Sequence, residues 1–285
     1  MKNKLLTILI VAIASLLLFG CAAQTQKEVV KEAPKKLMLA TTTSTYDTGL
    51  LDFILPNFES KNNYEVQVIS VGTGQALKNG QDGNVDVVLV HAPSSEKKFM
   101  TDGYGINRKC VMYNDFIILG PITDAAMIKG KSANDALLAI AKTKSNFISR
   151  GDNSGTYTKE LDLWKKINIT AVNQSWHLET GLGMGDTIRI ADEKRAYTLT
   201  DRGTYLALKS NYTDLVILVE GDNVLLNPYG VIMVNPEKNP GVNTAGAQLF
   251  EDWLMSEETQ NLIGSFKKGG EQLFYPLKGE CLPGQ

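Results

Sequence analysis

Short runs of β-branched and other apolar residues alternate with longer segments of helical periodicity from Leu37 onwards. Runs of this kind, bounded by Gly, Asn, Asp or Pro, are typical of buried strands. The predicted strands are Leu37–Ala40, Glu65–Val71, Val85–Val90, Cys110–Leu119, Phe147–Ser149, Ala196–Leu199, Leu215–Val219 and Gly230–Val234. Because helical segments of roughly 10–15 residues separate several strands, the pattern predicts βαβ units with mostly parallel sheets.

Segments with apolar residues on one helical face are predicted to be helices. They are Asp47–Glu59, a helix capped by Ser132, Thr156–Ile167 and Thr244–Met255. Serine favours the position before a helix because its oxygen accepts from a free amide of the first turn. Pro56 lies inside the first segment, where it removes a backbone donor, so we expect a kink or an early end there.

Two long apolar strands, Val111–Leu119 and Tyr229–Val234, enclose a section with its own strand–helix pattern. This arrangement predicts a second α/β lobe inserted into the first. Lobe I would comprise residues 37–115 with 228–285, and lobe II residues 116–227. A single doubly wound sheet is the alternative.

The N-terminus has the pattern of an export signal. Lys2 and Lys4 precede the apolar run Leu5–Phe19, which is shorter than the roughly 20 apolar residues that span a bilayer. The run ends at Gly20-Cys21, which resembles a bacterial lipobox. Residues 1–20 are therefore predicted to be a lipoprotein signal peptide, Cys21 the lipidated residue, and residues 21–36 a flexible tether. An uncleaved anchor or ordinary secretion is the alternative.

Composition argues against several functional classes. The net charge is −2 and no basic block occurs, which argues against nucleic-acid binding. The two histidines, His91 and His177, are too few for a zinc site in the absence of a cysteine cluster. Cys110 and Cys281 could pair outside the cell or remain free thiols, because sequence separation does not fix their distance in the fold.

Two loops that join a strand to a helix are rich in hydrogen-bond donors. Thr41–Thr45 has five consecutive hydroxyl residues, although threonine also favours strand ends and helix caps. Ser70–Leu77 contains Gly72-Thr73-Gly74, and glycine lets the backbone approach a ligand closely. A plain glycine turn is the alternative for this second loop.

A third loop, Arg150–Thr156, adds a permanent positive charge. Its guanidinium offers a fork of donors, and we expect Asp152 to accept from Arg150 or from the loop backbone. A solvated turn with a surface Arg–Asp pair is the alternative. All three loops follow strands and precede helices, where free amides and the helix dipole favour anions. Because the carboxyl ends of strands bind ligands in open α/β sheets, the three loops together predict an anion site in a cleft between the lobes.

These three loops, together with Tyr197–Thr204 and Asn227–Tyr229, resemble the tungstate-binding proteins of bacterial ABC importers. The resemblance covers nearly the whole chain from Leu37. It implies an α/β periplasmic-binding-protein fold of two lobes, type II-like, with a mostly parallel sheet flanked by helices in each lobe. The ligand would lie in the interlobe cleft. The pattern of the third loop is shared with phosphate-binding proteins, so it does not choose the anion.

The resemblance also implies the function and the residues that perform it. An extracytoplasmic protein, lipid-anchored at the outer face of the membrane and monomeric, would capture tungstate, or molybdate less tightly, and deliver it to an ABC permease. It would need no cofactor and would not be an enzyme. Thr200 and Asp201 are assigned supporting or hinge roles, and the choice between Thr42 and Thr43 stays open. The residues implied to bind the oxyanion are Thr42, Thr43, Ser44, Thr73, Arg150, Ser154, Gly155 and Thr156.

The candidate anions differ in whether they carry a proton. Tungstate carries no proton near neutral pH and suits a site of donors, whereas hydrogen phosphate rewards an acceptor; the first two loops offer hydroxyls and amides. Three alternatives remain: a phosphate-binding protein, an extracellular sensor domain, and a hydrolase. The hydrolase would use Ser44 or Ser154 as nucleophile, and His91 is the candidate base.

Overall fold

The computed structural model describes residues 32–152, 154–212 and 214–282. All described secondary structure belongs to one compact unit, which begins at Pro34. Cys21 and the predicted signal peptide lie outside the described residues. The first strand begins at Lys35, two residues before its predicted start at Leu37.

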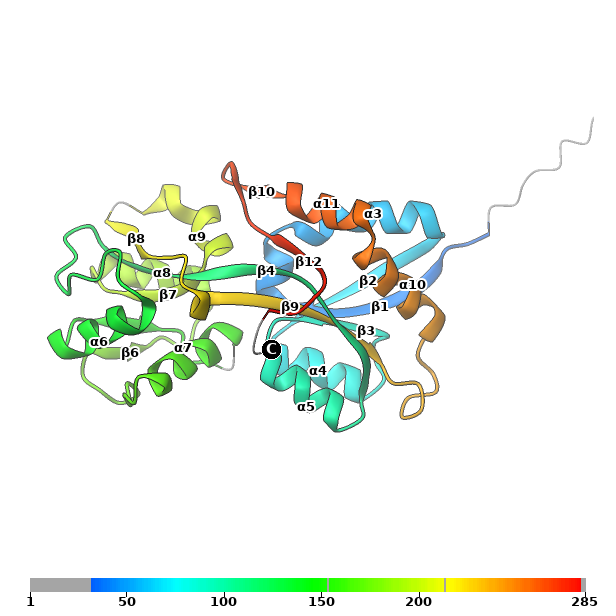
Figure 1. Cartoon of the computed structure of the whole chain (residues 1–285), viewed down its shortest axis with the longest axis horizontal. Helices are drawn as coiled ribbons and strands as arrows, with labels where there is room; N and C mark the ends of the chain where they lie inside the picture. Colours follow the sequence, from blue (N-terminus) through cyan, green and yellow to red (C-terminus); the bar gives the residue numbers. More distant parts are fainter. Residues whose placement is uncertain (1–31, 153, 213, 283–285) are drawn as a thin grey trace, which may run out of the picture. The chain divides into compact units, whose positions relative to one another are not determined.

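One group of elements is formed by residues 35–101 and 244–279, in the region predicted as lobe I (Figure 1). Its strands are β1 (Lys35–Thr42), β2 (Tyr64–Val71), β3 (Val87–Val90), β10 (Lys267–Lys268), β11 (Glu271–Gln272) and β12 (Tyr275–Gly279). Its helices are α2 (Thr43–Asp47), α3 (Leu50–Asn62), α4 (Thr73–Gln81), α5 (Pro93–Thr101), α10 (Thr244–Met255) and α11 (Glu257–Ser265).

The intervening section forms a second group of strands and helices, the region predicted as lobe II. Its strands are β5 (Phe147–Ser149), β6 (His177–Glu179), β7 (Thr198–Asp201) and β8 (Leu215–Val219). Its helices are α6 (Ala133–Thr143), α7 (Gly155–Lys166), α8 (Met184–Glu193), α9 (Arg202–Leu208), and the short 3-10 turns η1 (Lys209–Asn211) and η2 (Asn223–Leu225).

Two long strands connect the groups, as the sequence predicts. β4 (Gly105–Pro121) pairs with β9 (Leu226–Val234) and β12 in its first part and with β7 and β8 in its last part. Both β4 and β9 run from one group of elements to the other in Figure 1. The fold is thus a two-lobe α/β fold.

The sheets are mixed rather than mostly parallel. β1 pairs in parallel with β2 and β3, and β5 with β6. β4 and β9, however, run antiparallel to each other, and so do β9 and β3. The reason is topological, because a strand that leaves a lobe and a strand that returns to it must run in opposite directions.

Separate apolar cores lie on either side of the connecting strands. Leu37, Leu50, Phe58 and Phe250 belong to one core, whereas Phe147 and Trp164 belong to another core built from residues between Phe116 and Leu225. Each group of elements therefore buries its own hydrophobic side chains, which is what independent lobes require.

The first predicted helix, Asp47–Glu59, corresponds to α3 alone, and its predicted start is three residues too early. α2 ends at Asp47, and α3 begins at Leu50 after Gly49, whose φ of 83° breaks the helical path. Of the two outcomes expected at Pro56, a kink or an early end, the early end does not occur, since α3 continues to Asn62. Ser132 caps α6 as predicted and accepts from the amide of Asp135.

Cys110 and Cys281 form a disulfide, with their Cα atoms 5.1 Å apart. This bond ties the C-terminal segment to β4. Among the described residues, none of the helices combines the length and the apolar character that crossing a membrane requires.

Candidate functional site

The first loop continues β1 directly into α2. Thr41 is buried and donates its hydroxyl to the carbonyl of Leu89 at 2.8 Å, which ties the loop to β3. Thr42 caps α2, where its Oγ1 accepts from the amide of Thr45 at 3.2 Å. Thr43 and Ser44 follow; Thr43 is exposed and Ser44 is half-buried. Of these hydroxyl residues, Thr43 and Ser44 line a cavity.

The second loop lies beside the first because β1 and β2 are parallel neighbours. Thr42 is paired in register with Val71, so Gly72 and Thr73 extend past the same edge of the sheet. Thr73 is the first residue of α4 and is buried, and its Oγ1 has no hydrogen-bond partner among the described residues. A buried hydroxyl without a partner is uncommon and indicates a missing partner.

In the third loop, Asp152 accepts hydrogen bonds from both Arg150 and the loop backbone. Arg150 donates from Nη2 to Asp152 Oδ2 at 2.6 Å, and the amide of Ser154 donates to Asp152 Oδ1 at 3.1 Å. The predicted supporting role of Asp152 therefore matches its contacts. Arg150 Nε is buried and has no hydrogen-bond partner among the described residues. The guanidinium is thus fixed in direction and still has donor capacity to spare.

The start of α7 packs against His91. Ser154 caps α7 and accepts from the amide of Tyr157 at 3.2 Å. A Cβ added at Gly155 would lie 2.8 Å from His91 Cε1, so only glycine fits there. Thr156 is buried in the first turn. Since Ser44 Oγ lies 3.2 Å from His91 Nε2, His91 stands between the first and third loops.

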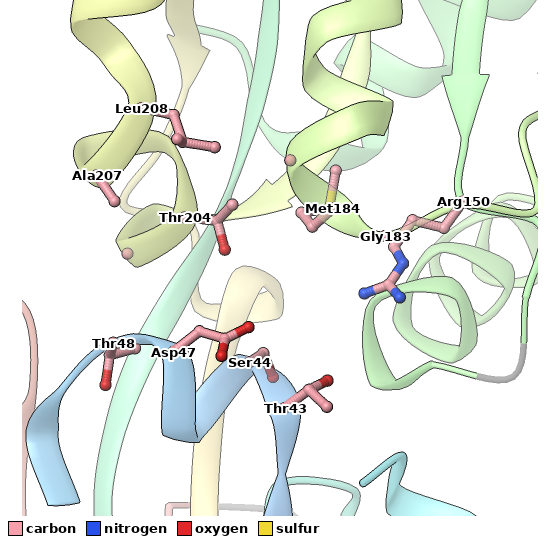
Figure 2. Close-up of a pocket in the computed structure, with 12 residues that line it drawn as sticks. Thr43, Ser44, Asp47, Thr48, Arg150, Gly183, Met184, Thr204, Ala207 and Leu208 are labelled. Atoms are coloured by element: carbon pink, nitrogen blue, oxygen red, sulfur yellow. The ribbon is translucent and has the colours of Figure 1, made fainter. Parts of the chain in front are cut away.

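A cavity of about 320 Å³ opens beside these loops. Figure 2 shows the guanidinium of Arg150 directed toward Thr43 and Ser44, which project from the segment after β1. Thr42, Thr73, Ser154 and Thr156 are absent from its lining; Gly155 lines a second cavity of about 370 Å³, together with His91, Lys159 and Asn227. The first cavity is lined by Thr43, Ser44, Asp47, Thr48, Arg150, Gly183, Met184, Gly185, Gly203, Thr204, Ala207 and Leu208.

Several of these lining residues were not predicted from the sequence. Gly183 and Gly185 flank the first residue of α8, whose capping residue Gly183 makes no side-chain hydrogen bond. The signal was present as a glycine-rich segment, Gly181–Gly185, ahead of a helix. Asp47 also reaches the cavity, where Figure 2 shows its carboxylate on the same segment as Ser44.

Asp201 is a buried carboxyl group close to Gly203 and Thr204, which line the cavity. This residue caps α9 and accepts from the amide and the hydroxyl of Thr204 at 2.8 and 2.7 Å. Burial raises the pKa of Asp201, and the positive charge of Arg150 opposes that rise. Arg202 pairs instead with Asp115 and Glu220. Among the described residues, His, Cys, Asp and Glu form no cluster able to hold a metal ion.

Known proteins resemble the chain over most of its length. The model of the PBP superfamily domain matches residues 23–258. The tungstate-binding protein TupA of Peptoclostridium acidaminophilum is 48% identical over 97% of this chain and 99% of its own. The solved tungstate-binding protein TupA of Desulfovibrio alaskensis G20 has a TM-score of 0.80 at 46% identity and covers 85% of this chain and 99% of its own. The solved tungstate ABC transporter protein of Geobacter sulfurreducens has a TM-score of 0.74 at 53% identity, with 81% of this chain and 98% of its own covered.

Proposed function

Because this chain belongs to the PBP superfamily, in the family of the tungstate-binding TupA proteins, we propose that it captures tungstate outside the cytoplasm for an ABC importer. Molybdate is expected to bind less tightly. The proposed ligand residues are those implied by the sequence: Thr42, Thr43, Ser44, Thr73, Arg150, Ser154, Gly155 and Thr156.

The observation that carries the proposal is a pair of buried donors without partners. Arg150 Nε and Thr73 Oγ1 come from different lobes, yet each lies at the end of a strand that leads to the proposed site. Leaving such groups unpaired in a protein interior costs about 1–3 kcal/mol each, and a ligand that accepts from both would remove this cost. A tetrahedral dianion offers acceptors on all four oxygens.

The number of donors is sufficient for tight binding. Hydrogen bonds to a charged group contribute about 1.5–3 kcal/mol each, and nanomolar affinity requires roughly 12 kcal/mol. The hydroxyls, the guanidinium, and the amides at the starts of α4 and α7 exceed this requirement before the cost of association is subtracted. Selectivity then depends on how many of the groups that face the ligand are donors.

Isothermal titration calorimetry of the purified chain tests the proposal. Tungstate, molybdate, sulfate and phosphate are titrated separately at pH 7.5. We expect tungstate to have the lowest dissociation constant, molybdate a higher one, and sulfate and phosphate much higher ones. Absence of binding by all four anions, or tighter binding of phosphate than of tungstate, contradicts the proposal.

Phosphate is the nearest alternative ligand, and Asp47 is the observation that favours it. Its carboxylate lines the cavity and could accept the proton of hydrogen phosphate. Asp47 is however exposed, so water solvates it. If phosphate were the ligand, Asp47→Asn would weaken phosphate binding; for tungstate, we expect this substitution to leave the affinity equal or slightly higher, because a like charge is removed.

A hydrolase is the alternative from another class. Ser44, His91 and Asn227 stand in hydrogen-bond contact in the order of nucleophile, base and orienting group. Burial lowers the pKa of His91 to about 4, which makes it a weak base for removing a serine proton. The named relatives are binding proteins, and we expect no hydrolysis of p-nitrophenyl acetate or p-nitrophenyl phosphate above that of a Ser44→Ala control.

The proposal includes the location and the partners. Residues 1–20 are proposed to be a signal peptide and Cys21 the lipidated residue, so a monomer would be tethered outside the cytoplasm and deliver its ligand to the permease. Lobe I would comprise residues 37–115 with 228–285 and lobe II residues 116–227, with β4 and β9 as hinges. Mass spectrometry of the membrane fraction tests the anchor, since Cys21→Ala would abolish the lipid adduct.

A further inference from the structure

Six buried polar side chains form a closed ring of hydrogen bonds next to the proposed site. They come from the first loop, the end of β3, and both connecting strands, and each is at most 7% exposed. The members are Thr42, Thr45, His91, Asn114, Asn227 and Tyr229.

One side of the ring has a fixed direction. Asn227 Nδ2 donates to Asn114 Oδ1 at 2.8 Å, and Asn114 Nδ2 donates to the Tyr229 hydroxyl at 3.1 Å. Tyr229 is also hydrogen-bonded to Thr45. Because the tyrosine oxygen already accepts from Asn114, its own hydrogen is available for Thr45. Thr45 Oγ1 in turn lies 2.6 Å from Thr42 Oγ1. Because Thr45 accepts from Tyr229, it donates its own hydrogen bond to Thr42.

His91 closes the ring through both ring nitrogens. Nδ1 lies 3.1 Å from Asn227 Oδ1, and an amide oxygen only accepts, so Nδ1 carries the proton. The imidazole is also hydrogen-bonded to its own backbone, and burial keeps it neutral by lowering its pKa to about 4. Nε2 is therefore an acceptor with one lone pair.

Two hydroxyls compete for that lone pair. Thr42 Oγ1 lies 3.1 Å from Nε2, and Ser44 Oγ lies 3.2 Å from it. When Thr42 donates to Nε2, the hydrogen bonds around the ring all run in one direction. Thr42 Oγ1 also accepts from the amide and the hydroxyl of Thr45, so it keeps no hydrogen for the ligand, which leaves Thr43 and Ser44 as the donors of the first loop. Ser44 is then free to turn its hydrogen toward the cavity that it lines without leaving a buried group unpaired.

We propose that His91 is a positioning and specificity-determining residue. It accepts a hydrogen bond from Thr42, so that Ser44 presents its hydroxyl hydrogen, not a lone pair, to the oxyanion. The inference deepens the proposed function and depends on it. A ring whose hydrogens all point one way fixes the hydroxyl orientations of the first loop. A proton-bearing anion such as hydrogen phosphate then meets a hydrogen where it needs an acceptor.

The packing of His91 supports this role. Its ring packs against that of Tyr229 of β9, with the centroids 4.8 Å apart and the planes tilted by 37°, and Gly155 at the start of α7 lies against its Cε1 atom. His91 thus contacts the first loop, the helix start of the third loop and a connecting strand. A shift of its ring would displace groups of both lobes at once.

Two substitutions of His91 separate this role from simple packing. Leucine in His91→Leu cannot accept a hydrogen bond, so the hydroxyls of Thr42 and Ser44 become free to present lone pairs. His91→Gln retains an acceptor near the Nε2 position. Competition calorimetry gives the dissociation constants of tungstate, sulfate and phosphate for each variant of the full chain at pH 7.5.

We expect the ratio of the phosphate to the tungstate dissociation constant to fall at least about tenfold in His91→Leu and to stay within about threefold of the wild-type value in His91→Gln. Sulfate, which resembles phosphate in size but carries no proton, should not gain relative to tungstate. If His91 only packs, all three anions weaken by the same factor and the ratio is unchanged, which overturns the inference while the proposed function stands. Failure of the wild-type chain to bind tungstate would remove the proposed function itself.

A second pair of variants covers the case in which His91→Leu does not fold. Thr42→Val removes the hydroxyl that donates to His91 Nε2. Ser44 then donates to Nε2 instead of to the oxyanion. We expect the tungstate dissociation constant to rise about tenfold, and Thr42→Ser, which keeps the hydroxyl, to restore it. Equal affinities of the valine and serine variants would contradict the ring mechanism.

Discussion

At the scale of single residues, the proposed site contains polar atoms that are buried and have no hydrogen-bond partner among the described residues. Thr73 Oγ1 and Arg150 Nε are buried without partners among the described residues, whereas Thr42 and Asp152 are fully engaged by neighbouring groups. A polar group whose hydrogen bonds are all made within the protein holds neighbouring groups in place. A group that has none is available to a ligand.

Arg150 carries the largest predicted effect on binding. We expect Arg150→Ala to raise the tungstate dissociation constant at least about tenfold, since one or two hydrogen bonds to a charged group are lost at about 1.5–3 kcal/mol each. Discrimination among the four oxyanions should also decline. Calorimetry measures both effects. Arg150→Lys is the matched control, because it keeps the charge but not the planar fork; an alanine variant with wild-type affinity would place Arg150 outside the site.

His91 links stability to pH. Its pKa is about 4 in the folded chain and ordinarily 6.5, so between these values the unfolded chain binds a proton that the folded chain does not. The free energy of unfolding therefore falls as the pH decreases from 6.5 to 4, by about 3 kcal/mol in total, and the effect is absent above pH 6.5. Urea denaturation of the wild type and of His91→Gln between pH 4 and 8 isolates this contribution. Parallel pH profiles would show that His91 does not titrate in this range.

At the scale of elements, helix starts both build the fold and present donors. α6 and α7 begin in the same way, with a serine that accepts from an amide of the first turn. Only α7 begins at the proposed site. The two helices therefore offer a matched comparison between a cap that has one role and a cap that has two.

We expect Ser132→Ala and Ser154→Ala to lower the free energy of unfolding by a similar amount, about 1 kcal/mol each, because each loses one cap. Only Ser154→Ala should raise the tungstate dissociation constant, by about tenfold, because its hydroxyl is also a proposed donor. Thermal denaturation and calorimetry on the two variants provide the test. An unchanged affinity in Ser154→Ala would assign this residue to capping alone.

At the scale of the whole molecule, the disulfide joins the C-terminal segment to β4. Cys110 and Cys281 are 171 residues apart in sequence, so their bond removes many conformations from the unfolded chain. β12 pairs with the same part of β4, and neither cysteine is among the residues that line the cavity.

We expect the double substitution of Cys110 and Cys281 by serine to lower the free energy of unfolding by about 2–4 kcal/mol. The tungstate dissociation constant should stay within about twofold of the wild-type value. Treatment of the wild type with a reductant should reproduce the loss of stability and add two titratable thiols after denaturation, one each from Cys110 and Cys281. An unchanged number of thiols after reduction would contradict the bond.

The sequence by itself determined the local elements and the donor-rich loops. Strand Phe147–Ser149, strand Leu215–Val219 and helix Thr244–Met255 have the predicted bounds, because side-chain periodicity and caps act within a few residues. The same locality made the three loops after strands recognisable as anion-binding segments.

Only the tertiary structure decided which of those donors are free. His91 and Asn227 are 136 residues apart in sequence, and the pairing of β3 with β9 brings them together. No periodicity encodes this contact, the disulfide, or the arrival of α8 at the cavity. Sheet pairing and burial set them, because a polar side chain that loses water must find partners wherever the folded chain provides them.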